Sequence, residues 1–279
     1  MTQSAVSKLC AELEDEVGVP LFERTTRRVV PCDGASDLYD HAQQVLGTLR
    51  SAERSLAGLR GLEHGRLSFS SSPMMMHALL QPAIAHFHLE HPGISLDLYE
   101  LTTEESVEFV RSGRGDFSLV AFSGDDPQLD ARMVLREPMR LAVPPGHVLA
   151  SRHNVLWPEL ALHEHITLRS VYSVRRTIDR ILNAHGVGLP STIQAGTLSS
   201  ALGLVRAGLG VTLVPSYAAS FAVNLGLNVV NVGGDLEEHH EISLLTRRDS
   251  RPSLAAAAFI AQLDELLDGR PRSPRSSND

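Results

Sequence analysis

Cysteine, aromatic residues and long apolar runs are all scarce in this chain of 279 residues. Two cysteines, Cys10 and Cys32, are too few for a disulfide scaffold and form no CxxC motif, so we expect ordinary packing and a cytoplasmic protein. No apolar stretch reaches the roughly 18 residues of a transmembrane helix, and the N-terminus lacks the basic-then-apolar order of a signal peptide. These absences exclude a disulfide-rich secreted protein and predict no membrane partner.

The chain also lacks an excess of positive charge. Its formal net charge is −8, which argues against a protein that coats nucleic acid nonspecifically. Sequence-specific binding needs only a local cluster of positive side chains, so this function stays open. Because 43% of the residues are hydrophobic and the chain exceeds one typical domain, we expect a small unit followed by a larger one with a sizeable core.

Residues 1–32 predict a helix, a turn and a basic hairpin. Thr2 is a candidate for the helix cap, and Gly18 is suited to end the helix in a left-handed conformation. Between them, apolar residues recur at spacings of three and four and form one stripe: Val6, Leu9, Leu13 and Val17. The spacing predicts an amphipathic helix from about Gln3.

The polar face of this helix is the candidate DNA-binding surface. Short polar and basic side chains at the N-terminal end of a helix suit contacts with base edges and phosphates. The candidates on the first turns are Thr2, Gln3, Ser4, Ser7 and Lys8. Arg27 and Arg28 follow in a turn between short apolar runs, as a wing that touches the DNA backbone would. From these residues alone, a solvated helix with a charged turn is an equally good interpretation.

Residues 33–62 predict one long helix with a narrow apolar stripe. Its apolar residues alternate at spacings of four and three: Leu38, Ala42, Val45, Leu49, Ala52, Leu56 and Leu59. This 3.5-residue repeat is typical of a seam between paired helices, so we expect a homodimer. Packing of the helix against the body of the same chain is the alternative.

Residues 63–268 alternate strand-like and helical segments, which predicts a parallel sheet with helices on its faces. We expect two lobes in this α/β domain. Lobe I takes about residues 63–138 and 242–268, and lobe II about 139–241, because the late strand and the last helix return to the first lobe. Residues 269–279, rich in Pro, Arg and Ser, are expected to be disordered.

Small hydroxyl side chains at strand-to-helix junctions are the candidate effector-binding residues. In open α/β sheets, ligands lie beyond the carboxyl ends of strands and near helix N-termini. The candidates are Ser71, Ser72, Thr102, Thr103, Ser170, Thr197 and Ser199, with Arg169 adding a positive charge. These groups favour a small anion such as an organic acid. Helix capping needs the same residue types and is the better explanation for any single hydroxyl.

Metal binding and catalysis are both unsupported by the motifs. The run from Glu237 to Glu241 contains two histidines, but no further ligands follow at fixed spacing, so a solvated turn between strands is expected. The chain has no Gly-x-Ser-x-Gly, phosphate-loop or His-Glu-x-x-His motif. We therefore expect neither a metal, nor a cofactor, nor an enzyme.

The N-terminal segment resembles the LysR family of transcriptional regulators. The matching positions are Thr2, Gln3, Ala5, Val6, Ser7, Lys8, Leu13, Glu14, Gly18, Leu21, Phe22 and Arg24. The resemblance extends over about residues 2–268. It implies a winged helix-turn-helix head whose first helix enters the major groove, and a wing at Arg27 or Arg28. It also implies a dimer or tetramer, and a periplasmic-binding-protein-like domain that closes on an effector.

The chain departs from the family pattern at its start. Family members carry about two further helices before this motif, usually ending in Val where this chain has Met1. We hypothesise a reading frame begun too late at a GTG codon, and we expect a weakened or poorly ordered DNA-binding head. A stand-alone small-molecule binding protein with a non-functional head is the alternative function.

Overall fold

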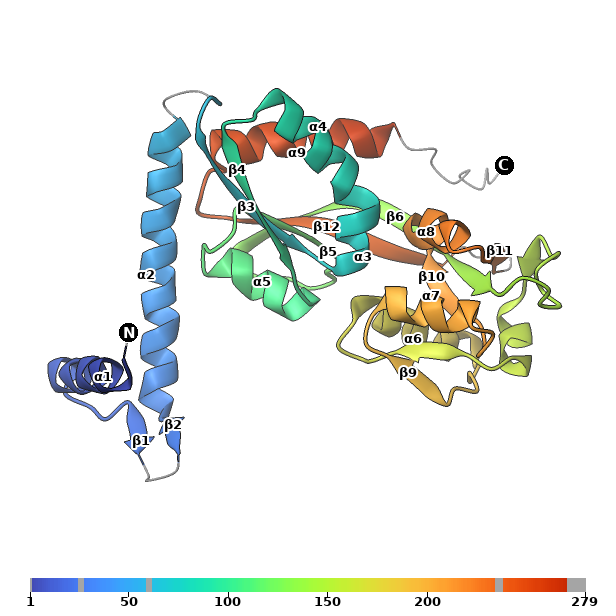
Figure 1. Ribbon diagram of the computed structural model, residues 1–279, viewed down its shortest axis with the longest axis horizontal. Coiled ribbons are helices and arrows are strands. Elements are labelled where there is room, and N and C mark those ends of the chain that lie inside the picture. Colours follow the sequence, from blue (N-terminus) through green and yellow to red (C-terminus); the bar gives the residue numbers. More distant parts are fainter. Residues whose placement is uncertain (1, 25–27, 59–61, 234–237, 270–279) are drawn as a thin grey trace.

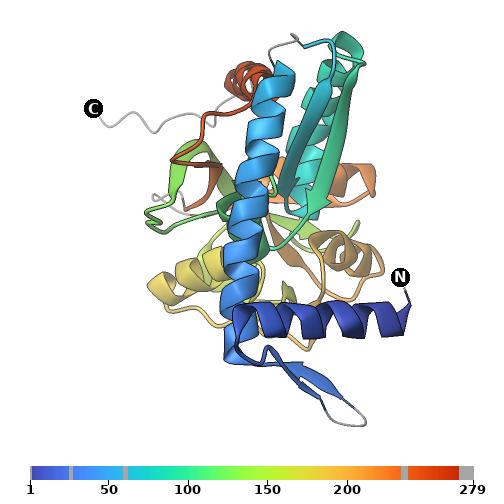
Figure 2. The same ribbon diagram turned by 90° about the vertical axis from the view of Figure 1, so that its left-hand side faces the viewer.

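A computed structural model describes residues 2–24, 28–58, 62–233 and 238–269 of the chain. Three parts follow one another: a small head, a long helix and a two-lobed α/β domain (Figure 1). The long helix, α2 (Asp33–Gly58), carries the head at its N-terminal end, and the α/β domain begins after its other end. Figure 2 shows the head helix crossing the base of α2, and Figure 1 shows that the head lies on the side of α2 away from both lobes.

The head consists of α1 (Gln3–Val17) and a hairpin of β1 (Phe22–Arg24) and β2 (Val29–Pro31). Gly18 ends α1 with a φ of 73°, a conformation that favours glycine, as expected. A Glu14 oxygen accepts hydrogen bonds from two backbone amides at the start of the hairpin, at 2.8 and 2.9 Å, and so ties hairpin to helix.

The expected capping role of Thr2 is wrong in one respect. Thr2 holds the cap position with extended backbone, but its side chain accepts no hydrogen bond from a helix amide. Its hydroxyl lies 3.2 Å from that of Ser4 instead. The backbone carbonyl of Thr2 accepts from the amides of Ala5 and Val6, so the first turn closes through backbone bonds alone.

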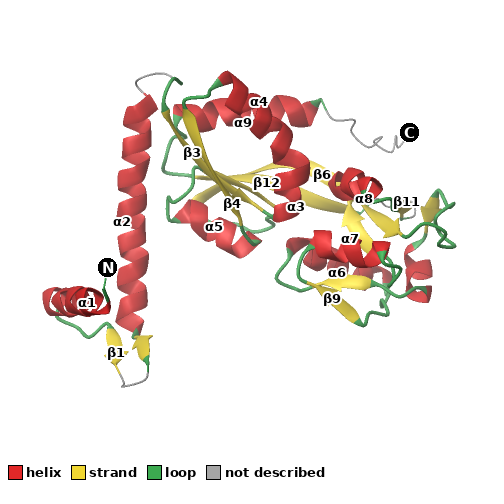
Figure 3. Cartoon of the chain, in the orientation of Figure 1, coloured by secondary structure: helices red, strands yellow, loops and turns green. Residues whose placement is uncertain are grey.

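Lobe I is built on a sheet covered by helices on both faces (Figure 3). The aromatic rings of Phe69, Phe117 and Phe259 stack in its core, with centroids 4.7 to 5.7 Å apart. Its elements are β3 (Gly65–Ser71), α3 (Pro73–Met75), the π-helical segment η1 (Met76–Leu80), α4 (Gln81–Glu90), β4 (Ile94–Glu100), α5 (Thr103–Arg111), β5 (Phe117–Val120), β12 (His239–Arg247) and α9 (Leu254–Asp268).

Lobe II is reached along β6 (Leu129–Val143), a strand that runs from one lobe into the other. β6 pairs with β12 up to Pro138, and with β10 and β11 from Met139 onward. The other elements of lobe II are β7 (Asn154–Val155), η2 (Trp157–Leu162), β8 (Ile166–Leu168), α6 (Ser173–His185), β9 (Ile193–Ala195), α7 (Leu198–Arg206), β10 (Thr212–Pro215), η3 (Ser216–Ala218), α8 (Ala219–Asn224) and β11 (Asn228–Val232).

The expectation of a parallel sheet holds for only part of the molecule. β3 pairs parallel with β4 and β5, and β8 pairs parallel with β9, as βαβ connections require. β12 is antiparallel to both β5 and β6, and β6 is antiparallel to β10 and β11. The sheet is therefore mixed, because β6 and β12 return between the lobes without an intervening crossover helix.

The solvated turn expected at residues 237–241 is also wrong for its last three residues. His239, His240 and Glu241 belong to β12, and His240 is completely buried. Glu237 lies outside the described residues, as do residues 270–279 with their expected disorder. Within the described ranges, no three metal-ligating side chains converge, and no helix combines the length and apolarity needed to cross a bilayer.

Candidate functional site

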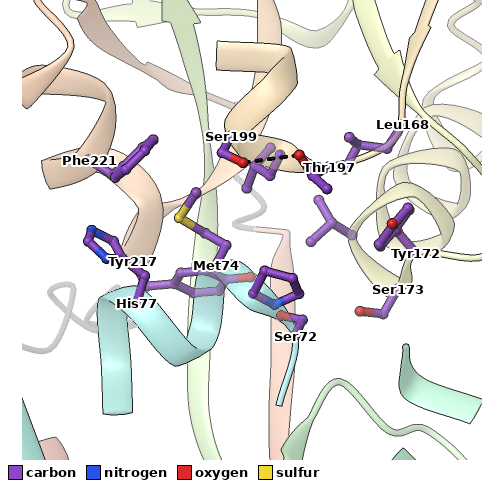
Figure 4. Close-up of a pocket in the computed structure, with 13 residues that line it drawn as sticks. Ser72, Met74, His77, Leu168, Tyr172, Ser173, Thr197, Ser199, Tyr217 and Phe221 are labelled. Carbon is purple, nitrogen blue, oxygen red and sulfur yellow. Dashed lines mark hydrogen bonds between the residues drawn. The ribbon is translucent and has the colours of Figure 1, made fainter. Parts of the chain in front are cut away.

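A cavity of about 200 Å³ lies where the two lobes meet, and we call it the first cavity. Lobe I supplies the start of the helix that follows β3, and lobe II supplies the N-terminal ends of α6 and α7 and the segment after β10 (Figure 4). The lining residues are Ser72, Pro73, Met74, His77, Leu168, Tyr172, Ser173, Val174, Thr197, Leu198, Ser199, Tyr217 and Phe221.

The polar groups of the first cavity are hydroxyls near helix N-termini. Thr197 caps α7, since its hydroxyl accepts a hydrogen bond from the Ser200 amide at 3.1 Å, and it lies 3.0 Å from the Ser199 hydroxyl. Ser72 precedes α3, but its side chain makes no capping bond to the helix amides. Together with Ser173, the first residue of α6, these groups present donors to a small ligand.

Apolar and aromatic side chains form the rest of the wall. The rings of His77 and Phe221 meet edge to face with centroids 5.0 Å apart. Met74 and Tyr217 are both buried beside them, and Figure 4 shows these four side chains gathered on one side of the cavity. Among the described residues that line the cavity, none is Lys, Arg, Asp or Glu.

Three of the predicted effector residues meet in the first cavity: Ser72, Thr197 and Ser199. Four others lie outside it. Ser71 is buried in the sheet and donates to the carbonyl of Leu119, and Thr102 exchanges hydrogen bonds with Glu105 in a capping box. Arg169 and Ser170 are exposed and do not line the cavity.

Thr103, the remaining predicted residue, lines a larger and more polar space of about 840 Å³ between α5 and α6, which we call the second cavity. Three arginines line this second cavity: Arg111, Arg176 and Arg180. Each has an acidic partner, respectively Asp126 at 2.6 Å, Glu104 at 2.8 Å and Glu238 at 3.3 Å. The pair of Glu104 and Arg176 joins the two lobes.

A buried polar cluster lies beside the first cavity, where β6 and β12 pass between the lobes. Glu137 and His240 are cross-strand neighbours, and Glu137 accepts a hydrogen bond from the hydroxyl of Ser216. His240 Nδ1 lies 2.9 Å from the hydroxyl of Thr177. Burial, with a smaller contribution from Arg180, lowers the pKa of His240 to about 4.

Tyr217 belongs to the same cluster and also lines the first cavity. Burial, together with the negative charge of Glu137, raises the pKa of the Tyr217 phenol above its ordinary value. Its hydroxyl and Nε2 of His240 have no hydrogen-bond partner among the described residues. The phenol therefore stays neutral and remains a potential donor.

Four of the predicted DNA-binding residues, Gln3, Ser4, Ser7 and Lys8, lie on the exposed N-terminal half of α1, and Thr2 is exposed just before it. Lys8 is exposed and pairs with Glu12 one turn later, at 3.6 Å. Arg28 is exposed next to the hairpin, whereas Arg27 lies outside the described residues. The apolar side chains Val6, Leu9 and Leu13 are also exposed, at 45%, 53% and 41%.

One face of α2 packs against lobe I, and the opposite face is exposed. Gly47 is buried against lobe I, where an added Cβ would lie 1.8 Å from the carbonyl oxygen of Ser112. Val45 and Leu49 point the other way, because two residues correspond to about 200° of helix rotation, and they are 69% and 59% exposed. Leu59 and the side chains of Ala52 and Leu56 lie outside what the structure describes.

The sequence interpretation missed the apolar wall of the first cavity, namely Met74, His77, Tyr217 and Phe221. Tyr217 and Phe221 follow β10, in a strand-to-helix junction whose hydroxyl residue Ser216 was not among the candidates. Met74 and His77 lie one turn into a helix interrupted by a π-helical segment, a feature frequent at functional sites. Both pairs lie just after a strand, Met74 and His77 after β3 and Tyr217 and Phe221 after β10, so the order of strands and helices in the sequence is the signal that indicates them.

A polar helix at the tip of a long helix, joined to a two-lobed domain with an interlobe cavity, defines a ligand-responsive regulator of transcription. Family models support this class. The LysR substrate binding domain matches residues 60–268, and the bacterial regulatory helix-turn-helix protein of the lysR family matches residues 1–35. The chain therefore belongs to the LysR family of transcriptional regulators, which bind DNA and small-molecule effectors and act as oligomers.

Similar proteins agree with this assignment. A probable hydrogen peroxide-inducible genes activator of Mycobacterium avium is 30% identical over 222 residues, which cover 78% of this chain and 70% of that protein. The structure of full-length CbnR with its target DNA has a TM-score of 0.62 at 20% identity, covering 96% of this chain and 91% of that one. The effector-binding domain of QuiR in complex with shikimate has a TM-score of 0.65 at 14% identity, covering 74% and 98%. The family and these relatives are regulators and not enzymes.

Proposed function

We propose that this regulator binds its operator through the N-terminal half of α1, pairs through α2, and responds to a small organic acid in the first cavity. The observation that carries the proposal is the interlobe cavity, where hydroxyls from both lobes meet at the N-terminal ends of α6 and α7. Such positions favour anions, because helix amides without intrahelical partners point toward the ligand. Shikimate, the ligand of the QuiR domain, is an organic acid of the same kind.

We propose the following division of the chain. The head takes residues 1–32, the dimerisation helix 33–62, and the effector domain 63–268, with a tail after it. The exchange of strand partners along β6 between Pro138 and Met139 supports a lobe boundary there. Since chromosomal operators are the partners of this class, we infer that the protein acts in the cytoplasm.

For DNA contact, we propose Gln3, Ser4 and Ser7 as groups that read bases, and Lys8 and Arg28 as groups that contact phosphates. Their exposure on one end of α1 supports this assignment, since a recognition helix reaches base edges with its N-terminal residues. Arg27, next to Arg28, is proposed for the same backbone contact by resemblance.

Fluorescence anisotropy with DNA from immediately upstream of the coding frame tests these roles. We expect Lys8→Ala to weaken binding to all sequences and to reduce the salt dependence. Gln3→Ala should remove about 1–3 kcal/mol of discrimination between operator and mutated operator. Glu16→Ala, on the last turn of α1, is the control. Absence of binding both by this chain and by a version extended upstream in frame would contradict the proposal and favour a stand-alone binding protein.

For the effector, thermal shift with a panel of organic acids gives the first test. A ligand at 100 times its Kd stabilises the folded state by roughly 2.7 kcal/mol, which is a measurable shift for a domain of this size. If no acid moves the melting temperature, an organic-acid effector is excluded.

A further inference from the structure

Helix α5 contacts both lobe II and the long helix that carries the head (Figure 1). At its N-terminal end, Glu104 pairs with Arg176 of α6 at 2.8 Å. Just beyond its C-terminal end, Ser112 and Gly113 lie against Gly47 of α2, where an added Cβ would come within 1.8 Å of the Ser112 carbonyl oxygen. The nine residues of α5 therefore connect lobe II with α2.

The facing surfaces of α5 and α6 carry opposite charge. α5 contains three glutamates and one arginine, whereas α6 contains three arginines and one aspartate. The charged residues of the two helices that line the second cavity are Glu104, Glu108, Arg111, Arg176 and Arg180. Arg111, the arginine of α5, is neutralised by Asp126 and Glu108, both at 2.6 Å. Opposite charges attract, so the electrostatic interaction across this cavity favours a closer approach of the lobes.

The ion pair of Glu104 and Arg176 crosses from one helix to the other. Arg180, by comparison, has its acidic partner Glu238 within lobe II, at 3.3 Å. The side chains of Glu104 and Arg176 are 63% and 43% exposed, so their interaction is weak and decreases with salt concentration. A weak contact of this kind shifts the balance between two arrangements of the lobes without fixing either one.

α5 is attached to lobe I through a hydrophobic cluster of its own. Phe109 and Val110 pack with Val120, Leu129 and Leu245, and these five buried residues are separate from the continuous core that includes both lobes. Such a satellite cluster can adjust with its helix while the main core stays packed. Small sliding movements of packed helices are a common form of domain closure.

We propose that α5 is a coupling helix: the Glu104–Arg176 ion pair draws it toward α6, and its other end transmits the separation of the lobes to α2. When the ion pair is formed, the contact between Ser112 and Gly47 is tight. When the ion pair is broken, α5 relaxes into lobe I and that contact loosens. The inference goes beyond the proposed function, because it requires neither DNA nor a particular effector.

The separation of the lobes can be measured by double electron–electron resonance in a chain with both cysteines replaced by serine. Spin labels are attached at Leu89→Cys in α4 and Leu162→Cys in η2, whose native side chains are 81% and 79% exposed. An excess of unlabelled chain ensures that each oligomer contains one labelled copy. We expect Arg176→Glu to increase the ratio of long to short distances about twofold to fivefold, the range for an exposed ion pair. Raised salt concentration should have the same effect on the native chain.

Hydrogen exchange of the α2 amides around Gly47 reports on the other end of α5. We expect Arg176→Glu to accelerate this exchange about twofold to fivefold, in proportion to the change in the lobes, and to leave β3 unchanged. Glu104→Arg combined with Arg176→Glu restores opposite charges and should return both measurements close to their native values. Asp264→Arg is the matched control, because it disrupts an exposed ion pair with Arg132, at 2.9 Å, within lobe I. It should change neither measurement.

Each outcome supports or overturns the inference. If Arg176→Glu and salt leave the distances unchanged, the ion pair does not hold the lobes. If the distances change while exchange around Gly47 stays native, α5 does not couple the lobes to α2. If the charge swap fails to restore the native values, the effect of Arg176→Glu does not come from this ion pair. Any of these results overturns the inference, and none bears on DNA or organic-acid binding, which the tests of the proposed function measure separately.

Discussion

Two buried histidines couple the stability of this protein to pH. His240 lies between the lobes, and His165 is buried in lobe II, where its Nε2 donates to the Leu160 carbonyl at 2.9 Å. Burial is the main cause that lowers the pKa of both to about 4 from an ordinary value of 6.5. Both side chains are therefore neutral in the folded protein at physiological pH.

The direction of the pH dependence follows from proton binding. Between about pH 6.5 and 4 the unfolded chain binds protons at these positions and the folded chain does not, so stability is complete above that window and falls as the pH decreases through it. The loss amounts to at most roughly 3 kcal/mol for each histidine. We expect urea denaturation to show this decrease between pH 7 and pH 5.

A variant isolates the contribution of His240. His240→Asn should reduce the pH slope of the free energy of unfolding, even if its stability at pH 7 is lower. His88→Asn removes an exposed histidine of α4 and should leave the slope unchanged. Equal slopes in the native protein and the His240→Asn variant would show that this side chain does not titrate differently on folding.

At the scale of elements, the crossing of α2 over the end of α5 joins the DNA-binding part to the effector domain. Gly47 meets the carbonyl of Ser112, and Gly113, with a φ of 70°, ends the same turn against the backbone of Gly47. α5 has its other end at the second cavity, where Thr103 and Glu104 lie. One short helix therefore touches both the cleft between the lobes and the helix that carries the head.

For the stability of a Gly47→Ala variant, helix propensity and packing lead to opposite expectations. Helix propensity alone predicts a gain of about 1 kcal/mol. A Cβ at 1.8 Å from a backbone oxygen forces the two elements apart, so we expect a lower melting temperature. Gly34→Ala, in the same helix with its nearest contact at 3.9 Å, should be neutral or stabilising. Equal behaviour of the two variants would contradict a tight crossing.

The exposed face of α2 predicts how two chains pair. Val45 and Leu49, two members of the predicted seam, are 69% and 59% exposed in the single chain. Pairing of two α2 helices along the seam would bury them. We expect Val45→Glu with Leu49→Glu to convert the oligomer to a monomer, measured by sedimentation or light scattering. Ser36→Glu adds a charge nine residues from Val45, on the opposite face, and should leave the oligomer intact. A dimer that survives the double change uses another surface.

At the scale of the whole molecule, head and effector domain differ in how well they are packed. One continuous hydrophobic core includes residues of both lobes, from Phe69 and Phe259 in lobe I to Trp157 and Ile181 in lobe II. In the described part of the head, Leu21 is the single buried large apolar side chain. Most of the stability thus belongs to the effector domain, since burial of apolar surface is the main favourable contribution to folding.

Hydrogen exchange measured by mass spectrometry should reveal this difference. We expect amides of α1 to exchange much faster than those of β3, β5 and β6, and the two lobes to be protected to a similar degree. Equal protection of α1 and the central strands would show that the head is as stable as the effector domain.

Periodicity and junction chemistry in the sequence were enough to determine the main elements: an amphipathic first helix ended by Gly18, a long helix with a 3.5-residue repeat, and alternating strands and helices. These features depend on neighbours within a few positions, so they can be read along the chain. The candidate hydroxyls of Ser72, Thr197 and Ser199, which line the first cavity, were predicted for the same reason.

Only the tertiary structure determined which strands pair, which side chains are buried and which residues line the cavity together. The partner exchange along β6, the buried place of His240 and the apolar wall with Tyr217 and Phe221 all depend on contacts between segments far apart in the chain. Arg169 and Thr102 have the same local signals as the cavity residues, yet one is exposed and the other is engaged in a capping box. Local sequence sets the conformation of a segment, but burial and charge depend on what the fold places beside it.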